Sequence, residues 1–167
     1  HPQAMLFLVP RHPERFSEVA GLIEACGLTH VTRSSAAIAD PRTTVFLGDT
    51  MGELMTFYAA ADVAFVGGSL SAIGGHNLLE PASLGIPVIT GPHNENAADI
   101  FALLVACGAA SVASDAAGVA AEVCCLFSDP EERRRRGAAG QAAITDNNGA
   151  LERLLRLVDP LVPDGAS

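Results

Sequence analysis

Two glycine pairs, Gly67-Gly68 and Gly74-Gly75, lie between the strand-like apolar runs 63–66 and 87–90. Glycine at the C-terminal end of a buried strand lets the backbone turn sharply and approach a ligand closely, because no Cβ intervenes. Ser69 follows the first pair, and its hydroxyl could either bond to phosphate or satisfy the backbone of the loop. This stretch predicts a turn that binds phosphate, as in nucleotide sites.

The segment 76–80 (HNLLE) then predicts the start of a helix. Asn77 followed three residues later by Glu80 is the pattern of a capping box. The first turn of a helix presents N–H groups and the positive end of its dipole, which suit phosphate. Glu80 could also accept hydrogen bonds from a ribose diol, and its carboxylate is able to serve both roles.

Pro10 and Arg11 come directly after the apolar run 4–9. A guanidinium group in that place can chelate a phosphate. The plainer reading is a surface arginine that pairs with Glu14 or Glu18.

Met51, Gly52 and Glu53 follow the apolar run 44–47. Gly52 would let a base or ribose lie against the backbone, and Glu53 could accept a hydrogen bond from a base amino group. Alternatively, Glu53 serves the dipole of the helix that begins there, and Met51 belongs to the core.

Strand-like and helix-like segments alternate along the chain. The strands are expected at 4–9, 29–33, 44–47, 62–66, 87–90 and 109–113, and the helices at 14–26, 53–61, 94–107, 116–127, from Asp129-Pro130 onward, and at 150–158. This order predicts βαβ units, and hence an α/β, Rossmann-like parallel sheet of about six strands with helices on both faces. We expect one domain over residues 1–159 and a frayed tail over 160–167. Ligands of such sheets bind beyond the C-terminal ends of the strands, where the three clusters lie.

Composition and charge exclude several classes of function. A net charge of −9 argues against nucleic acid, whose binders carry a basic stripe, but it is compatible with a single nucleotide. The cysteines and histidines show no metal-ligand spacing, so we expect no metal site. No apolar run is long enough to span a bilayer, and no self-contained catalytic set is visible. We therefore expect a soluble fragment that binds a nucleotide and lacks a catalytic base.

The run Arg133 to Arg136 follows Glu131 and Glu132. Pairs of opposite charge four residues apart, Glu131 with Arg135 and Glu132 with Arg136, predict ion pairs on a solvated helix face. This reading is favoured over a site for nucleic acid or lipid, because four consecutive residues point all round a helix.

Several motifs together resemble a known family. They are LVPRHPERF (8–16), LGDTMGEL (47–54), FYAAADVAFVGGSL (57–70), GGHNLLEPASLGIPVITGPH (74–93) and NGALERLL (148–155). In this order and spacing they resemble the 3-deoxy-D-manno-oct-2-ulosonic acid (Kdo) transferases of lipopolysaccharide assembly. The resemblance runs from residue 7 to about residue 158.

The resemblance implies the C-terminal, donor-binding half of a GT-B glycosyltransferase, whose donor is CMP-Kdo. Carried over by motif, the contacts to the nucleotide are Pro10, Arg11, Met51, Gly52, Glu53, Asn77, Leu78, Leu79 and Glu80, with Gly67, Gly68, Ser69, Gly74 and Gly75 in the phosphate loops. Glu80 is expected on the ribose and Arg11 near the phosphate.

The resemblance also implies what this chain lacks. In the family, the N-terminal half supplies the general base, the membrane attachment and the site for the lipid A precursor that accepts the sugar. Transfer is inverting, needs no metal and uses no cofactor besides the donor. We expect the whole protein at the cytoplasmic face of the bacterial inner membrane, and this fragment to be inactive alone.

Two departures from the family pattern stand beside the donor. Leu78 replaces the usual Pro, and the stretch 91–97 lacks the common Thr and Phe, which bears on the fine details of the sugar-side contacts and not on the nucleotide site. Two alternative functions stay open: a stand-alone nucleotide-binding module, and a GT-B transferase or epimerase domain that uses a UDP-sugar.

Overall fold

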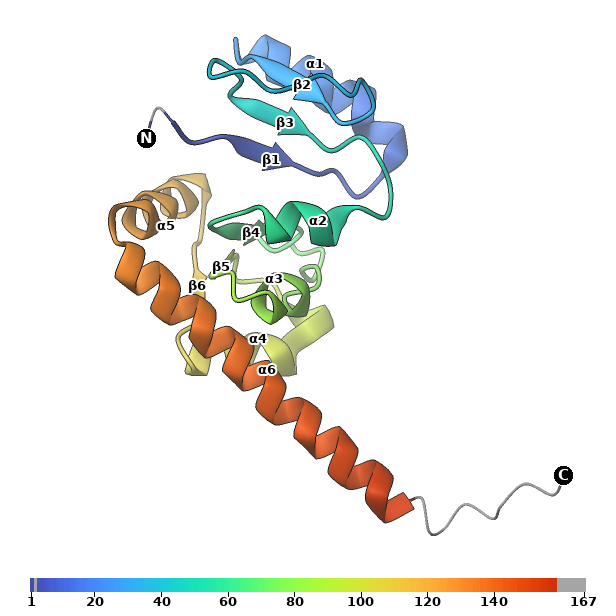
Figure 1. The fold of residues 1–167 in the computed structure, drawn as a ribbon, viewed down its shortest axis with the longest axis vertical. Coiled ribbons are helices and arrows are strands. Elements are labelled where there is room, and N and C mark those ends of the chain that lie inside the picture. Colours follow the sequence, from blue (N-terminus) through green and yellow to red (C-terminus); the bar gives the residue numbers. More distant parts are fainter. Residues whose placement is uncertain (2, 159–167) are drawn as a thin grey trace, which may run out of the picture. The chain divides into compact units, whose positions relative to one another are not determined.

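The computed structural model describes residues 1 and 3–158, with side chains up to residue 147 (Figure 1). The chain divides into two compact units, His1–Ala61 and Asp62–Ser167, and each has its own three-stranded parallel sheet. The predicted α/β class with parallel strands is confirmed, but the prediction of about six strands in one sheet is wrong. Alternating strands and helices predict parallel pairing without saying which strands are neighbours. One domain over 1–159 stays a prediction, and the tail 160–167 lies outside the described residues.

The first unit is built from three strands and two α-helices. Its elements are β1 (Leu6–Leu8), the 3₁₀ helix η1 (Pro13–Arg15), α1 (Phe16–Ala25), β2 (His30–Thr32), β3 (Val45–Leu47) and α2 (Leu54–Ala59). The strand order is β1-β3-β2. Val19 and Ile23 of α1 pack against Val45 and Leu47 on one face of the sheet.

The other face of the first sheet carries an aromatic cluster. Phe7 of β1 and Phe46 of β3 are paired in register, and both rings contact Phe57 of α2. The ring centroids lie 5.7–6.0 Å apart, within the usual range for stabilising aromatic pairs. Helices therefore cover both faces of this sheet, as predicted.

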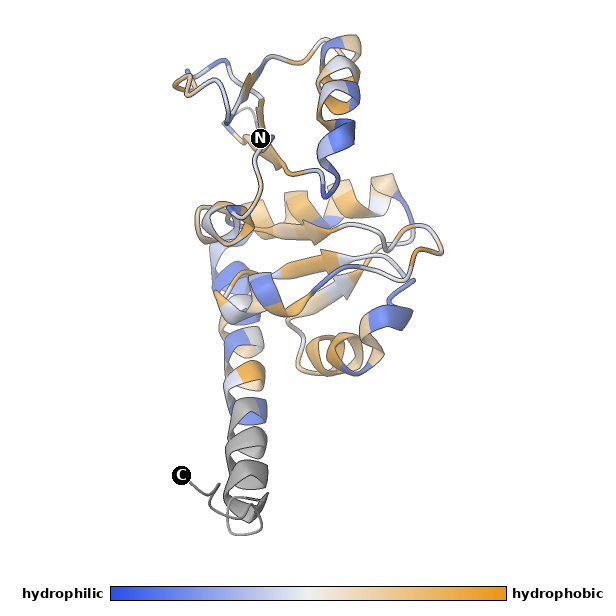
Figure 2. Cartoon of the chain, turned by 90° about the vertical axis from the view of Figure 1, so that its right-hand side faces the viewer, coloured by the Kyte–Doolittle hydropathy of each residue, from blue (hydrophilic) through white to orange (hydrophobic). Residues whose placement is uncertain are grey.

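The second unit contains the remaining elements. They are β4 (Ala64–Val66), α3 (Leu79–Ser83), β5 (Val88–Thr90), the 3₁₀ helix η2 (Glu95–Ala97), α4 (Ala98–Ala106), β6 (Ala110–Val112), α5 (Ala116–Ser128) and α6 (Pro130–Val158). The strand order is β4-β5-β6. Figure 2 shows hydrophobic colouring on these strands and on parts of the helices that cover them.

Alternate residues of β5 point to opposite faces, and each face has its own core. Val88 belongs to a cluster with Leu78, Ala82 of α3 and Leu104 of α4. Ile89 belongs to a second cluster, with Leu126 of α5. This sheet too is covered on both faces.

Helix α6 is one continuous helix of 29 residues, where the sequence predicted two. The polar segment around 145–148 does not end it. The Thr145 hydroxyl donates to the Gln141 carbonyl and the Asn147 amide donates to the Ala143 carbonyl, both four residues back on the same helix. The hydrogen-bonding groups of these side chains therefore find partners on the helix itself, and no turn is needed to supply them, so the helix continues.

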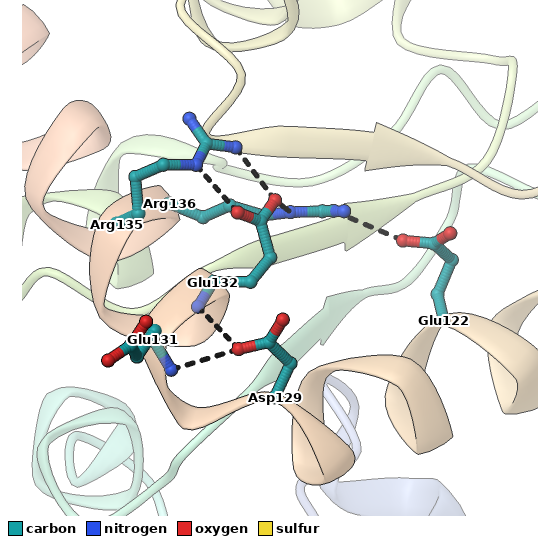
Figure 3. A network of polar contacts seen from close by, with 6 residues as sticks. All are labelled: Glu122, Asp129, Glu131, Glu132, Arg135 and Arg136. Carbon is teal, nitrogen blue, oxygen red and sulfur yellow. Dashed lines mark hydrogen bonds and ion pairs between the residues drawn. The ribbon is translucent and has the colours of Figure 1, made fainter.

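Helix α6 begins with a polar network that ties it to α5 (Figure 3). The Asp129 carboxylate accepts from the backbone N–H groups of Glu131 and Glu132 at 3.1 and 3.0 Å, which caps the helix. Arg136, with 17% of its side chain exposed, donates to Glu132 on its own helix at 2.7 Å and to Glu122 on α5 at 3.1 Å.

The predicted pairing is confirmed for Glu132 with Arg136 and is wrong for Glu131 with Arg135. Arg135 instead donates through two nitrogens to Glu132, at 2.6 and 2.7 Å. A guanidinium fork three residues away grips both oxygens of that carboxylate. The face is also less solvated than predicted, because Arg133 pairs with Asp62 and is 25% exposed.

Replacement of Glu132 by Gln tests the network through pH. Hydrogen bonds from Arg135 and then Arg136 lower the pKa of Glu132 from 4.5 to about 2. Because the folded-state pKa lies below the unfolded one, this stabilisation is complete above about pH 4.5 and is lost as pH falls toward 2. We expect Glu132→Gln to lower the free energy of unfolding at pH 6, and the difference from wild type to shrink below pH 4.5. Denaturant unfolding at several pH values measures it.

The matched control is Glu131→Gln, since the Glu131 side chain takes no part in the network. It should track wild type at every pH. A Glu132→Gln deficit that is the same at pH 6 and pH 2.5 would contradict the assignment.

Candidate functional site

The first unit brings two of the predicted clusters to one edge of its sheet. Pro10 and Arg11 follow β1, and Met51, Gly52 and Glu53 follow β3, which pairs with β1 in parallel. Arg11 is exposed and Pro10 is half-buried. The shared edge is the C-terminal edge of the strands, where ligands of such sheets bind.

Gly52 occupies the left-handed region, with φ of +81°. A Cβ added there would meet nothing within 4 Å, so glycine is needed for the turn and not for packing. Met51 is 64% exposed, so the alternative that placed it in the core is wrong. The backbone of this turn is open to a ligand.

Glu53 is held by two neighbours that the sequence did not reveal. Arg33, just after β2, donates to one carboxylate oxygen through Nε at 3.2 Å and Nη2 at 2.9 Å, and the Thr50 hydroxyl donates to the other. The hydrogen bond from Thr50 and then the guanidinium of Arg33 hold the pKa of Glu53 below its usual value. Glu53 is the residue before α2 and caps no N–H group with its side chain. It is thus an ionised acceptor fixed in direction.

Arg33 had one signal in the sequence. It follows a strand-like run, in the position that drew attention to Arg11. Its partner, Glu53, lies 20 residues further along the sequence, so no local pattern indicates the pair.

In the second unit the residues 67–76, which we call the glycine loop, connect β4 to the segment before α3. Backbone hydrogen bonds from Gly75 to the Gly68 carbonyl (2.9 Å) and from His76 to the Gly67 carbonyl (3.2 Å) close it. Gly68, Gly74 and Gly75 have φ of +73°, +95° and +73°. Residues that carry a side chain rarely adopt these backbone angles, so the loop needs glycine at all three positions.

Ser69 is completely buried at the base of this loop. Its hydroxyl donates to the Val66 carbonyl at 2.7 Å and accepts from the Gly91 N–H at 2.8 Å. Its carbonyl accepts from the His93 N–H at 3.0 Å. Of the two roles predicted for Ser69, the structure shows the second, because the hydroxyl serves the backbone and is turned away from solvent.

Thr90 and Asn94 extend this arrangement. The Thr90 hydroxyl donates to the Asn94 side chain at 3.0 Å, and the Asn94 amide donates to the Gly91 carbonyl at 2.7 Å. Ser69, Thr90 and Asn94 are 0%, 0% and 4% exposed. They are the polar or charged residues that are buried in the described part of the chain, and we call them the polar junction.

The predicted capping box at Asn77 is wrong. The Asn77 side chain accepts from the Leu79 N–H at 3.0 Å, and in the described structure no bond returns from Glu80 to Asn77. Helix α3 begins at Leu79 and has five residues, so its dipole is small.

Leu78 and Glu80 differ in what they offer a ligand. Leu78 is fully buried and packs in the core against Val88 and Leu104. Its side chain therefore stabilises the backbone of the site and is not open to a ligand. Leu79 is half-buried. Glu80 is also half-buried, and its carboxylate has no hydrogen-bond or ion-pair partner among the residues that the structure describes.

The chain matches a known family over most of its length. The model for "Glycosyl transferases group 1" matches residues 7–143. The chain belongs to this family. Within the described residues, this glycosyltransferase chain has no group of three or more His, Cys, Asp or Glu placed to hold a metal ion. Nor does any described helix combine the length and apolar character needed to cross a bilayer.

Two proteins similar to this chain are Kdo transferases. The chain is 46% identical over 161 residues to the 3-deoxy-D-manno-octulosonic acid transferase of Haemophilus influenzae, covering 96% of this chain and 38% of that protein. It is 41% identical over 155 residues to the enzyme of Bordetella pertussis, covering 92% of this chain and 36% of that protein. The resemblance found in the sequence is confirmed, and the chain spans under two-fifths of these curated relatives.

A solved structure shares the fold. The C-terminal CMP-Kdo binding domain of WaaA from Acinetobacter baumannii matches with a TM-score of 0.81 and 36% identity, covering 84% of this chain and 73% of that one. This glycosyltransferase chain therefore corresponds to a C-terminal domain.

A pair of serine-to-alanine changes tests the polar junction. Ser69→Ala leaves the buried Gly91 N–H without its acceptor, so we expect it to lower the free energy of unfolding by about 1–3 kcal/mol. The matched control is Ser111→Ala, because the buried Ser111 Oγ has no partner among the described residues. That change should be neutral or stabilising. Equal losses in the two variants, measured by denaturant unfolding, would contradict the role of Ser69.

Proposed function

We propose that this chain is the donor-binding domain of a glycosyltransferase that transfers Kdo from CMP-Kdo to a lipid A precursor in lipopolysaccharide biosynthesis. The observation that carries the proposal is the similarity to a solved domain described as binding CMP-Kdo, at 36% identity and a TM-score of 0.81. The acceptor site and the general base belong to an N-terminal domain of the same protein, at the cytoplasmic face of the inner membrane. This chain alone holds the donor and does not turn it over.

The chemistry of the donor explains the groups proposed to bind it. When the bond from the Kdo anomeric carbon to the CMP phosphate breaks, the bonding electrons stay with the phosphate oxygen, and negative charge develops there. Preorganised N–H groups and a guanidinium stabilise such charge. Arg11, exposed after β1, and the backbone of the glycine loop supply these groups. Transfer then proceeds with inversion and needs no metal ion.

The nucleoside is recognised at the other proposed contacts. The Glu80 carboxylate, which has no partner among the described residues, accepts from the ribose diol, beside Asn77 and Leu79. The turn at Pro10 and that at Met51 and Gly52 pack against the nucleotide. Arg33 and Thr50 direct the Glu53 carboxylate, whose remaining lone pairs accept from the amino group of cytosine.

Recognition by a carboxylate predicts selectivity among nucleotides. Uracil has a carbonyl where cytosine has an amino group, so UMP would face Glu53 with an acceptor and lose the contact. We expect the chain to bind CMP more tightly than UMP or AMP. Titration followed by NMR measures this, with amide shifts expected at residues 11, 51–53 and 67–80.

The outcome also separates the alternatives. A preference for UMP would favour a UDP-sugar enzyme over a Kdo transferase. Absence of binding to all three nucleotides by this chain would contradict the proposal.

Arg11→Ala tests the proposed phosphate contact. A charge-assisted hydrogen bond is worth about 1.5–3 kcal/mol, so the Kd for CMP should rise about 10- to 150-fold. Arg134→Ala, at an exposed arginine on α6, is the matched control and should bind CMP as wild type does. An unchanged Kd in Arg11→Ala would remove Arg11 from the site.

A further inference from the structure

The segment 91–97, directly after β5, binds residues 73–75 at the tip of the glycine loop through hydrogen bonds from Asn96. The Asn96 N–H donates to the Gly74 carbonyl at 3.0 Å. The Asn96 side-chain amide donates to the Ile73 carbonyl at 3.1 Å and the Gly75 carbonyl at 3.4 Å. A single asparagine therefore holds three consecutive carbonyl groups of the loop.

The two segments touch with no space between them. A Cβ added at Gly74 would lie 2.5 Å from the Asn96 amide nitrogen, and one added at Gly75 would lie 2.6 Å from the Asn94 side-chain oxygen. Both glycines are buried. The loop can thus approach Asn96 only because these positions carry no side chain.

The polar junction anchors the segment 91–97 from below. Asn94 is two residues from Asn96, is 4% exposed, and is bonded to Thr90 and to the Gly91 carbonyl. Ser69 joins Gly91 to the opposite end of the glycine loop. The segment that carries Asn96 is therefore attached to the end of the sheet, and the exposed Asn96 side chain contacts the loop from that attachment.

Holding a carbonyl also fixes an N–H group. In the planar trans peptide the C=O of one residue and the N–H of the next point in opposite directions. By binding the carbonyls of Ile73, Gly74 and Gly75, Asn96 sets the directions of the next three N–H groups. Those of Gly75 and His76 close the loop. The Gly74 N–H lies opposite the Ile73 carbonyl that Asn96 binds, so it points away from Asn96.

We propose that Asn96 is a positioning residue for the donor phosphate: it contacts the glycine loop and not the donor, and it fixes the loop backbone in its binding conformation. This inference rests on the proposed function, because it takes the glycine loop as the element that binds phosphate. The segment 91–97, which departs from the family pattern, then acts through the loop backbone.

The test compares CMP with cytidine, which lacks the phosphate. In Asn96→Asp, carboxylate oxygens replace the amide donor and face the carbonyls of Ile73 and Gly75. In Asn96→Ala, the side-chain donor is removed without adding charge, which keeps the test open where Asn96→Asp fails to fold. We expect the Kd for CMP to rise about tenfold or more in both variants, since the loss of about one charge-assisted hydrogen bond to the phosphate corresponds to about a tenfold change in Kd. The Kd for cytidine should stay within about twofold of wild type.

Asn147→Asp is the matched control. It makes the same chemical change at an exposed amide that donates to a backbone carbonyl on α6. It should leave both affinities unchanged. NMR titration of the 167-residue chain gives both constants, and the thermal midpoint shows whether each variant is folded.

Two results would overturn this inference but not the proposed function. In the first, wild type binds CMP more tightly than cytidine and the folded Asn96 variants bind both ligands as wild type does. In the second, the Kd values for CMP and cytidine rise by the same factor in the variants. Equal weakening would mean that Asn96 supports the fold in general. A wild-type chain that binds neither ligand would instead overturn the proposed function, and this inference with it.

Discussion

The hydroxyl of Ser69 joins the ends of two neighbouring strands. It donates to the carbonyl of Val66, the last residue of β4, and accepts from the N–H of Gly91, the first residue after β5. Both bonds are buried, where an unpaired polar group costs more than it does in water. The two loops that leave this edge of the sheet are therefore tied together where they begin, and Asn96 ties them again at the tip of the glycine loop.

This double attachment suits a site for a phosphate leaving group. A loop that is already ordered loses less entropy when the donor binds, and its dipoles need little reorganisation when charge develops. The proposed donor is an anion, whereas the chain has a net charge of −9. Many of its arginines are matched by carboxylates, including Arg33 by Glu53 and Arg136 by Glu122 and Glu132. Fixed backbone N–H groups attract phosphate without a further positive side chain.

Apart from α6, which was predicted as two helices, local patterns in the sequence predicted the strands and helices of both units to within a few residues. The apolar run 87–90 became β5 (Val88–Thr90), and the pattern at 116–127 became α5 (Ala116–Ser128). The glycine pairs were read as a loop at a strand end, and three of the four glycines have the left-handed backbone that only glycine adopts readily. These features depend on neighbours in the chain, which the sequence displays directly.

The sequence could not predict features set by distant contacts. Ser69 and Gly91 lie 22 residues apart, and Asn96 and Ile73 lie 23 apart, so no local pattern joins them. The motif around Leu78 matched a nucleotide site, but the Leu78 side chain is buried in the hydrophobic core. The Asn77 pattern fitted a capping box, yet the side chain bonds two residues on, to Leu79. For Ser69, Asn96 and Leu78 the local pattern was compatible with several partners, and tertiary packing decides which one is used. For Asn77 two local hydrogen-bond patterns were possible, and the shorter one forms.

Hydrogen exchange in the ligand-free chain tests the central claim most directly, which is that the glycine loop is held in place before any donor binds. The amides of Gly75, His76, Gly91, His93 and Asn96 make the bonds that close the loop and join it to the segment 91–97. If the polar junction is rigid, these five amides exchange as slowly as those of β5, through unfolding of the whole unit. Exchange at the loop that is orders of magnitude faster than at β5 would show that it opens locally, and would contradict the account.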